Sequence, residues 1–437
     1  MTRAHSPRIL IVSSLFTPSR RIGARRPERF ASGLVARGWD VTILTLNATY
    51  MVPLDPVYKA DPAVEVIRTG VVRPGAWIRD GVDWLRETGW WPGKHSPADP
   101  AAAPGSSPST TAPPLVDRAT ALFWRAVHAW EFPDPLFLWR PVAVPRVRDR
   151  RFDVVLGAVP TFTAALIAAD VARSAGGRLV LDYRDPWADL PQEQWTRYGN
   201  RGLVERHRSA EDRCLGEARL VVATSPTLCR WLAARTRAKV ILVQNSAEPR
   251  EPAGTQPDAN DPYVIYAGTL AYGRSLAPVI RAIRKLADRG VARVPRLLYA
   301  GDGGADVRRE ASAAGIPDRV VDLGQLGVSE TRRRVGGALA SVVVSSDRYM
   351  YQLPAKIFDL LPERRPILLI AADEADAADL VRRHALGWTH TPDDVDGIAR
   401  SLMAMVDGPT PAPRDLEALG NRRALDTLDA SLRETLG

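Results

Sequence analysis

A lysine and an aspartate stand three residues apart in "YQLPAKIFDLL" (351–361), where Pro354 predicts the first turn of a helix. The chain has only five lysines, and Lys356 is one of them. A cation at a helix start interacts unfavourably with the helix dipole, and a bound anion could offset this repulsion. Asp359, on the same helix face, could accept hydrogen bonds from a vicinal diol such as a ribose. The alternative is a surface ion pair between these two side chains, which stabilises a helix by only about 0.2–0.5 kcal/mol.

Two further segments end a β-rich run in glycine. In "YAGTLAYGR" (266–274), Gly268 follows the run and Arg274 precedes a predicted helix. Backbone N–H groups at a helix start, together with a guanidinium, suit a diphosphate, and the alternative is an ordinary turn. "YAGDGG" (299–304) lacks the full G-x-G-x-x-G fingerprint, which disfavours a nicotinamide or flavin enzyme, and the sequence contains no G-x-x-x-x-G-K-[ST] loop.

In the first half of the chain, three charges follow one another at the end of an apolar run. "VLDYRDPW" (180–187) contains Asp182, Arg184 and Asp185 before a proline. Charges clustered at a strand end lie where chemistry is expected in α/β proteins. The alternative is an internal Arg–Asp pair that caps the next helix.

A loop rich in arginine follows the first predicted strand. In "PSRRIGARRPERF" (18–30), five arginines surround Gly23. They are Arg20, Arg21, Arg25, Arg26 and Arg29. Planar guanidinium groups bind phosphate and carboxylate well, so the loop predicts an anion site, and the alternative is a solvated basic loop.

Length and composition predict two ordinary globular domains. The chain has 437 residues, 45% hydrophobic content, a formal net charge of +9 and a pI near 9.8. That charge suits an anionic partner, but an arginine-rich composition accounts for much of it, and no basic run interleaved with aromatics predicts a nucleic-acid surface. Neither the six histidines nor the two cysteines show metal spacing. No apolar run reaches the length of a membrane span or a secretion signal.

The order of predicted strands and helices indicates two parallel α/β sheets. We expect an N-terminal domain at 1–245 with a disordered insertion at about 94–114, a linker at 246–262, and a second domain at 263–408. A helical tail at 409–437 is expected to pack back on the first domain. Two such sheets joined by a linker predict a cleft, and ligands bind at the carboxyl ends of the strands.

Tryptophan is concentrated between residues 77 and 139. Tryptophan and arginine together suit a membrane interface or a large glycan or aromatic acceptor, and core packing is the alternative.

Six segments, in order along residues 8–405, together resemble glycosyltransferase family 4. They are "FTPSRRIGARRPERFASGLVARGWDVTILT", similar to a bacterial subgroup with a G-x-x-R-P-x-R-F loop, "DYRDPW", "VVATSPTLCRWL" with "VILVQNSAEP", "VIYAGTLAYGRSL", "LLYAGDGG" with "RVVDLGQLGVSE", and "LPAKIFDLLPERRPILL".

The resemblance implies a GT-B fold, with two Rossmann-like αβα domains facing across a cleft. It implies retaining transfer from a nucleotide sugar to a glycan, lipid-linked or natural-product acceptor, without a metal or other cofactor. Arg274 and Lys356 would bind the diphosphate and help it leave, with Asp182 or Asp185 positioning the acceptor. The other implied donor-binding residues are Gly23, Arg25, Gly268, Thr269, Gly301 and Asp359. Arg184 and Trp187 would contact the acceptor.

The sequence departs from the family pattern at two places. Tyr351 stands where the family has the first of two paired glutamates, and Arg184 stands near a position where many members have histidine. These departures leave open a non-catalytic module that binds nucleotide sugars or a partner. Transfer of a cyclitol is a further alternative, because the sequence does not separate it from transfer of a sugar. We expect a cytoplasmic protein with possible peripheral membrane contact and no nucleic-acid partner.

Overall fold

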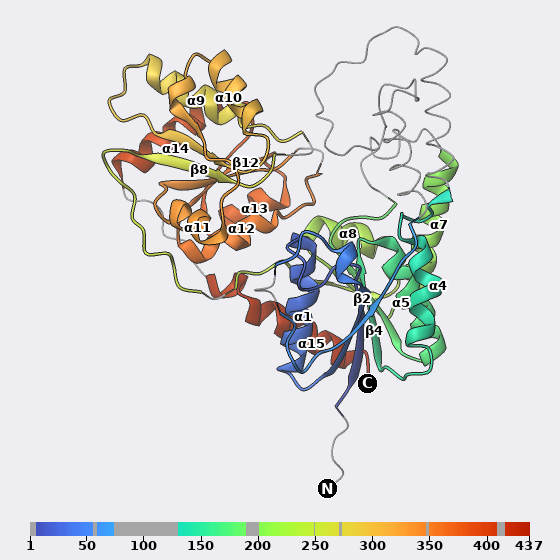
Figure 1. The fold of residues 1–437 in the computed structure, drawn as a ribbon. Coiled ribbons are helices and arrows are strands. Elements are labelled where there is room, and N and C mark those ends of the chain that lie inside the picture. The colour runs from blue at the N-terminus through green and yellow to red at the C-terminus, as the bar shows by residue number, and fades with distance from the viewer. Residues whose placement is uncertain are drawn as a thin grey trace, which may run out of the picture. The chain divides into compact units, whose positions relative to one another are not determined.

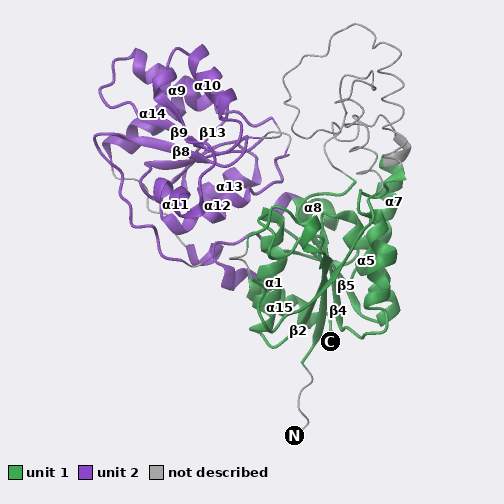
Figure 2. Ribbon diagram, viewed as in Figure 1, with its two compact units in different colours: residues 1–224, 228–243, 425–437 green, residues 225–227, 244–424 purple. Residues whose placement is uncertain are grey.

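The computed structural model describes residues 6–55, 59–73, 130–188, 201–248, 250–270, 273–346, 349–408 and 416–437. The predicted disordered insertion and the tryptophans between 77 and 124 lie outside these residues. The chain divides into two compact units (Figure 2). Unit 1 comprises Met1–Thr224, Leu228–Val243 and Leu425–Gly437, and unit 2 comprises Ser225–Thr227 and Gln244–Ala424.

Unit 1 is built on a parallel sheet of seven strands in the order β3-β2-β1-β4-β5-β6-β7 (Figure 1). Its strands are β1 (Arg8–Val12), β2 (Asp40–Leu46), β3 (Glu65–Thr69), β4 (Val154–Val159), β5 (Arg178–Tyr183), β6 (Leu220–Ala223) and β7 (Lys239–Leu242). Its helices are α1 (Arg25–Val35), α4 (Arg140–Ala143), α5 (Phe162–Ala175), α7 (Arg201–Glu217) and most of α8 (Pro226–Ala233).

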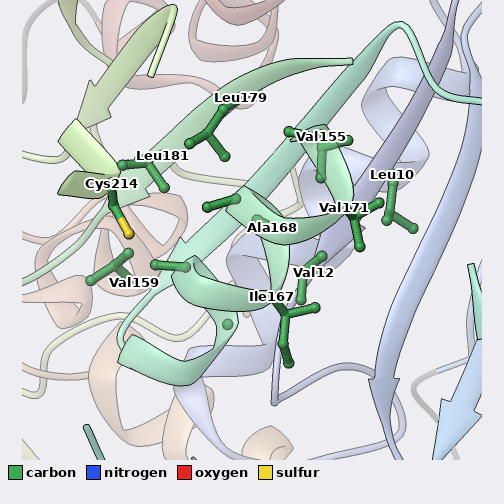
Figure 3. Packing of buried hydrophobic residues seen from close by; sticks show 14 of the residues in the cluster. Leu10, Val12, Val155, Val159, Ile167, Ala168, Val171, Leu179, Leu181 and Cys214 are labelled. Carbon is green, nitrogen blue, oxygen red and sulfur yellow. The ribbon is translucent and has the colours of Figure 1, made fainter. Parts of the chain in front are cut away.

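The central strands of unit 1 are apolar on both faces, as parallel strands covered by helices must be. Leu10 and Val12 of β1 pack with Ala168 of α5 and Cys214 of α7 on one face (Figure 3). The side chains of Ile9 and Ile11 point to the other face, because successive residues of a strand alternate.

The C-terminal helix α15 (Asn421–Glu434) begins in unit 2 and continues into unit 1. Within unit 1, Asp426 accepts a hydrogen bond from Arg37 at 2.6 Å, and Asp429 accepts one from the indole of Trp39 at 2.6 Å. Leu428 and Leu432 of the same helix are fully buried.

Unit 2 contains a parallel sheet of six strands in the order β10-β9-β8-β11-β12-β13. Its strands are β8 (Tyr263–Ala267), β9 (Arg296–Ala300), β10 (Val320–Asp322), β11 (Ala340–Val344), β12 (Ile367–Ile370) and β13 (Gly387–His390). Its helices are α9 (Ala277–Asp288), α10 (Gly304–Ala313), α11 (Val328–Gly336), α12 (Ala355–Leu360), α13 (Asp376–Arg383) and α14 (Val395–Asp407). One apolar cluster joins the sheet to α9, α10 and α14, and others join it to α11, α12 and α13.

The segment predicted as a linker is tied to unit 2 where the structure describes it. Ala253 N–H donates to the buried carboxylate of Glu363 at 2.7 Å, and the guanidinium of Arg365 donates to Thr255 O at 2.9 Å. Arg332 donates to the same glutamate at 2.6 Å. This stretch therefore packs on the surface of unit 2 through hydrogen bonds, despite its proline-rich composition.

Both sheets have one point where the strand order reverses. In unit 1 it lies between β1 and β4, and in unit 2 it lies between β8 and β11. At such a point the chain leaves the two neighbouring strands in opposite directions, which opens a crevice at their carboxyl ends. The loops after β1, β4, β8 and β11 are therefore the first places to look for a site.

Candidate functional site

The ammonium group of Lys356 lies at the switch point of unit 2. Lys356 is in the first turn of α12, after β11, and Nζ donates a hydrogen bond to the hydroxyl of Tyr266 on β8 at 3.0 Å. Nζ also lies 4.1 Å from the centroid of the Tyr266 ring. The described residues offer this lysine no carboxylate partner. The alternative of a surface ion pair with Asp359 is therefore wrong.

Two glycines, just after β8 and β9, allow close packing at this edge of the sheet. Gly268 has a φ of +125°, where side chains are strained, and its N–H donates to Ala300 O at 2.7 Å. A Cβ atom at position 268 would collide with Nζ and Cε of Lys356, and one at position 301 would collide with the carbonyl of Gly268. The absence of a side chain at Gly268 thus lets Lys356 lie against the backbone, and its absence at Gly301 lets the ends of β8 and β9 approach closely.

A second cation accompanies Lys356 on the same edge of the sheet. Arg274 follows the loop after β8, and its guanidinium donates to the side-chain oxygen of Gln352 at 3.3 Å. Burial and the nearby Arg274 lower the pKa of Lys356 to about 8. Two neighbouring cations, one of them largely buried and without a carboxylate partner among the residues that the structure describes, form a site suited to an anionic group.

The other predicted donor-binding residues of unit 2 lie near this edge but make different contacts. Thr269 is exposed, and its carbonyl accepts a hydrogen bond from Tyr266 at 3.1 Å. Asp359 is exposed, and its backbone carbonyl accepts from Arg250 at 2.6 Å. Tyr351 is 2% exposed and packs edge-on against Tyr349. Its buried ring thus occupies a place in the core, and the role of Asp359 toward a ribose stays a prediction.

In unit 1, Asp182 forms a buried ion pair that the sequence did not identify. Its carboxylate accepts from Nε of Arg26 at 2.8 Å and from Nη2 at 2.7 Å. Asp182 is 1% exposed and Arg26 is 3% exposed. The prediction that Asp182 positions an acceptor is therefore wrong in this structure, because both carboxylate oxygens are bound to Arg26. The alternative of an Arg–Asp pair is met only in part, because the arginine is Arg26 of α1, outside the cluster, and the pair is buried in the core of unit 1.

Arg184, at the end of β5, connects two loops of unit 1. Nη1 donates to Gly23 O at 3.1 Å, and Nη2 donates to Pro160 O at 2.6 Å. A Cβ atom at position 23 would lie 2.9 Å from Nη1, so Gly23 admits the guanidinium. Burial lowers the pKa of Arg184, while the carboxylates of Asp185 and Asp182 oppose that shift. Arg184 thus fixes the loops after β1 and β4 to each other at the switch point.

Trp187 belongs to the core of unit 1. It is fully buried, its ring stacks on Phe162 with centroids 4.9 Å apart, and its indole N–H donates to Nδ1 of His207 at 2.8 Å. Burial lowers the pKa of His207 to about 4, so this ring is neutral and accepts the bond. The prediction that Trp187 contacts an acceptor is therefore corrected, because its ring has no exposed surface.

Two further predicted residues of unit 1 keep part of their surface exposed. Asp185 is half-buried just after β5, and Arg25 is half-buried at the start of α1. Among the tryptophans predicted on the acceptor side, Trp139 is fully buried and donates to Thr69 Oγ1 at 2.7 Å, whereas Trp130 is 51% exposed. The alternative of core packing therefore applies to Trp139 and not to Trp130.

Sequence reasoning missed the residues that hold the predicted cations. Tyr266 contacts Lys356 and Gln352 contacts Arg274. Each lies inside one of the two quoted segments, but its contact is with the cation of the other segment. Two signals pointed to them. A tyrosine two residues before a strand-ending glycine faces the same side of the sheet as the glycine, and a glutamine precedes the helix that carries the lysine.

The described residues contain no group of three or more His, Cys, Asp or Glu side chains placed to hold a metal ion. Metal independence remains a prediction. Within the same part of the chain, no helix has both the length and the apolar character needed to cross a membrane.

Comparison with known proteins identifies the architecture. A scan of protein-family models finds no match, and a search of curated proteins also finds none. Among solved structures, sucrose-phosphate synthase from Thermosynechococcus elongatus is similar with a TM-score of 0.58 and 16% identity, covering 98% of this chain and 99% of that chain. The chain has the GT-B fold.

Two more structures with the GT-B fold match over nearly the full length. α,α-Trehalose 6-phosphate synthase from Burkholderia multivorans has a TM-score of 0.58 and 13% identity, and Anabaena HepE in complex with UDP-glucose has 0.55 and 13%. Each comparison covers 98% of this chain and 99% of the other. The fold prediction is therefore confirmed, while the finer resemblance to family 4 stays a prediction at these identities.

Proposed function

We propose that this protein transfers a sugar from a nucleotide-sugar donor to an acceptor. The observation that carries the proposal is the pair Lys356 and Arg274 at the switch point of unit 2, where no described carboxylate pairs with the lysine. An anion that brings its own negative charge would relieve the desolvated ammonium. The GT-B fold supports this interpretation, since the similar Anabaena HepE structure is a complex with UDP-glucose.

In the proposed donor complex, Lys356 and Arg274 bind the diphosphate. Gly268 and Gly301 leave the backbone at the ends of β8 and β9 open to close approach, and Thr269 lies on the exposed side of the same loop. Asp359 is the proposed ribose partner. The two cations would stabilise the negative charge that develops on the diphosphate as it leaves, which is the main electrostatic demand of this reaction.

The acceptor is proposed to bind unit 1 near the loops that Arg184 connects, where Gly23, Arg25 and Asp185 lie. The acceptor hydroxyl oxygen forms a bond to the anomeric carbon, and the bond from that carbon to the diphosphate oxygen breaks. The proton of the hydroxyl passes to the leaving diphosphate on the same face of the sugar, so the anomeric configuration is retained. Asp185 would orient the hydroxyl, and no metal is required because the cations carry the charge.

A panel of sugar nucleotides tests the proposal. Purified protein is incubated with UDP-, GDP-, dTDP- and ADP-sugars, and the release of nucleoside diphosphate is followed together with the melting temperature. We expect one base to raise the melting temperature by several degrees, because a ligand at about 100 times its Kd stabilises the folded state by about 2.7 kcal/mol. If no member of the panel changes either readout, the proposal is wrong.

Gly268→Ala is expected to lower nucleoside diphosphate affinity by about tenfold or more. The new methyl group would occupy the place of the Lys356 ammonium and would sit at a φ that strains alanine. Gly273→Ala is the matched control, since Gly273 also has a positive φ of +74° but a Cβ there meets no atom of the described residues within 4 Å. Isothermal titration of both variants checks this result, and equal losses would show that backbone strain alone is responsible.

The affinity for a nucleoside diphosphate is expected to fall as the pH rises through about 8. The pKa of Lys356 is lowered to about 8 in the free protein, and only the charged ammonium attracts the diphosphate. If the neutral form does not bind, affinity at pH 9 is about tenfold weaker than at pH 7. Lys356→Arg keeps its charge throughout and serves as control. A flat wild-type curve between pH 7 and 9 would contradict the assigned role of the lysine.

A further inference from the structure

The hydroxyl and ring of Tyr266 are the only contacts through which the described residues hold the Lys356 ammonium. Nζ donates to the hydroxyl at 3.0 Å and lies 4.1 Å from the ring centroid, so it sits above the ring close to the phenol oxygen. Tyr266 itself is 1% exposed. Because burial raises its pKa to about 12, the phenol keeps its proton at neutral pH.

Tyr266 is in turn fixed on three sides. It belongs to β8, its ring stacks on Tyr299 of β9 with centroids 5.7 Å apart and an interplanar angle of 2°, and its hydroxyl donates to Thr269 O at 3.1 Å. The hydroxyl hydrogen therefore points to a carbonyl, which leaves the oxygen lone pairs to accept from Lys356. Such an acceptor, together with an aromatic face, attracts a cation without adding the negative charge that a carboxylate would bring.

We propose that Tyr266 is a positioning residue that holds the Lys356 ammonium, charged and in place, for the diphosphate of the donor. This inference rests on the proposed function, because the diphosphate is the anion that the lysine meets. A carboxylate in the same position would compete with the diphosphate for the ammonium, whereas a neutral phenol leaves the positive charge uncancelled. Arg274, the other charged group acting on Lys356, disfavours its protonation. A hydrogen-bond acceptor such as the phenol oxygen favours the charged form of an ammonium, so Tyr266 would act against that effect.

The inference gives Tyr266→Phe a distinctive signature. The phenylalanine ring keeps the stacking on Tyr299 and the aromatic face, so only the hydrogen bond to Nζ and the bond to Thr269 are lost. Loss of an acceptor that favours the charged form lowers the pKa of the lysine. We expect the alkaline midpoint of nucleoside diphosphate affinity to move down by about one pH unit, with an affinity loss of no more than a few fold at pH 7.

Tyr299→Phe is the matched control. Tyr299 is the stacked partner, its hydroxyl likewise donates to a backbone carbonyl, that of Asp302, and it makes no contact with Lys356. A merely structural role of the tyrosine pair predicts similar effects of the two variants on stability and no movement of the pH midpoint. The positioning role predicts that only Tyr266→Phe moves it.

The test includes a readout that does not depend on activity. The chain has five lysines, so competitive acylation across pH 6 to 11 followed by peptide mass spectrometry yields the pKa of Lys356 directly, with Lys356→Arg identifying its peptide. Tyr266→Phe is expected to lower that value, and Tyr299→Phe to leave it unchanged.

The outcomes separate the two claims. A lower Lys356 pKa in Tyr266→Phe without nucleotide binding by any variant would support the contact and overturn the proposed function. An unchanged lysine pKa in a folded Tyr266→Phe variant would overturn the positioning role, whatever the enzyme does. An equal fall of the Lys356 pKa in Tyr299→Phe would also overturn the positioning role, because the Tyr299 hydroxyl makes no bond to Nζ.

Discussion

Lys356→Met is expected to reduce sugar transfer by about 100- to 1,000-fold while leaving the free protein at least as stable as the wild type. The loss follows from the removal of one of two cations that stabilise the leaving diphosphate, and removing one such group from an active site typically has an effect of this size. Methionine matches the length of the lysine stem, so the packing over Gly268 and Tyr266 is kept. Steady-state rates at saturating donor measure the loss.

The same substitution, Lys356→Met, is expected to raise the free energy of unfolding although it lowers activity. The folded-state pKa of Lys356, about 8, lies below its usual value of 10.5, so between these pH values the unfolded chain binds more protons and wild-type stability rises with pH. Below about pH 8 both states are charged and the folded state bears the full desolvation cost. Lys356→Met removes that cost, so we expect a gain on the order of 1 kcal/mol at pH 7 that shrinks above pH 8.

Lys285→Met is the control for both measurements. Lys285 lies on α9 and pairs with Asp396 at 2.5 Å on the surface, so its loss is expected to change neither the rate nor the stability by more than a few tenths of a kcal/mol. If Lys356→Met retained the wild-type rate, Lys356 would have no part in donor activation.

Asp182→Ala is expected to destabilise unit 1 by about 3–5 kcal/mol, because it leaves the buried guanidinium of Arg26 without a counter-charge. Replacing both partners at once, as Arg26→Met with Asp182→Leu, is expected to recover much of that loss, since no charge then remains buried. Urea unfolding followed by tryptophan fluorescence measures these differences.

Asp185→Asn tests whether a carboxylate at the same strand end affects turnover without affecting stability. Asp185 is half-buried and lies three residues after Asp182, so its substitution is expected to change stability by less than about 1 kcal/mol while lowering turnover. The interpretation fails if Asp182→Ala leaves the unfolding transition in place and abolishes turnover, because Asp182 would then act as a reacting group.

Much of the fold could be predicted from the sequence because the central strands are nearly continuous apolar runs. "RILIV" and "ASVVV" are buried along most of their length and form β1 and β11. The strands β3 ("EVIRT") and β13 ("GWTH") were not predicted; both are mostly half-buried and lie at the edges of their sheets. Their polar residues interrupt the run of apolar residues by which a strand buried on both faces is recognised.

The candidate site could be predicted only in part, because spacing identifies a charge but not its partner. The position of Lys356 at a helix start drew attention correctly, whereas its contact with Tyr266 joins residues 90 positions apart in the chain. Asp182 and Arg26 are separated by 156 positions, so the sequence does not show that they pair. The cluster "DYRD" therefore resembled a reactive site, although its first aspartate forms a structural ion pair with Arg26. A charged residue at a strand end thus needs its tertiary neighbours before a role can be assigned.

Isothermal titration of wild type and Lys356→Met with a nucleoside, its monophosphate and its diphosphate, for the base selected by the donor panel, tests the central claim most directly. We predict that the wild type binds the diphosphate at least tenfold more tightly than the monophosphate, and that Lys356→Met removes most of this preference. Equal affinities for all three ligands in the wild type, or an unchanged preference in Lys356→Met, would contradict the assignment of this lysine to the donor diphosphate.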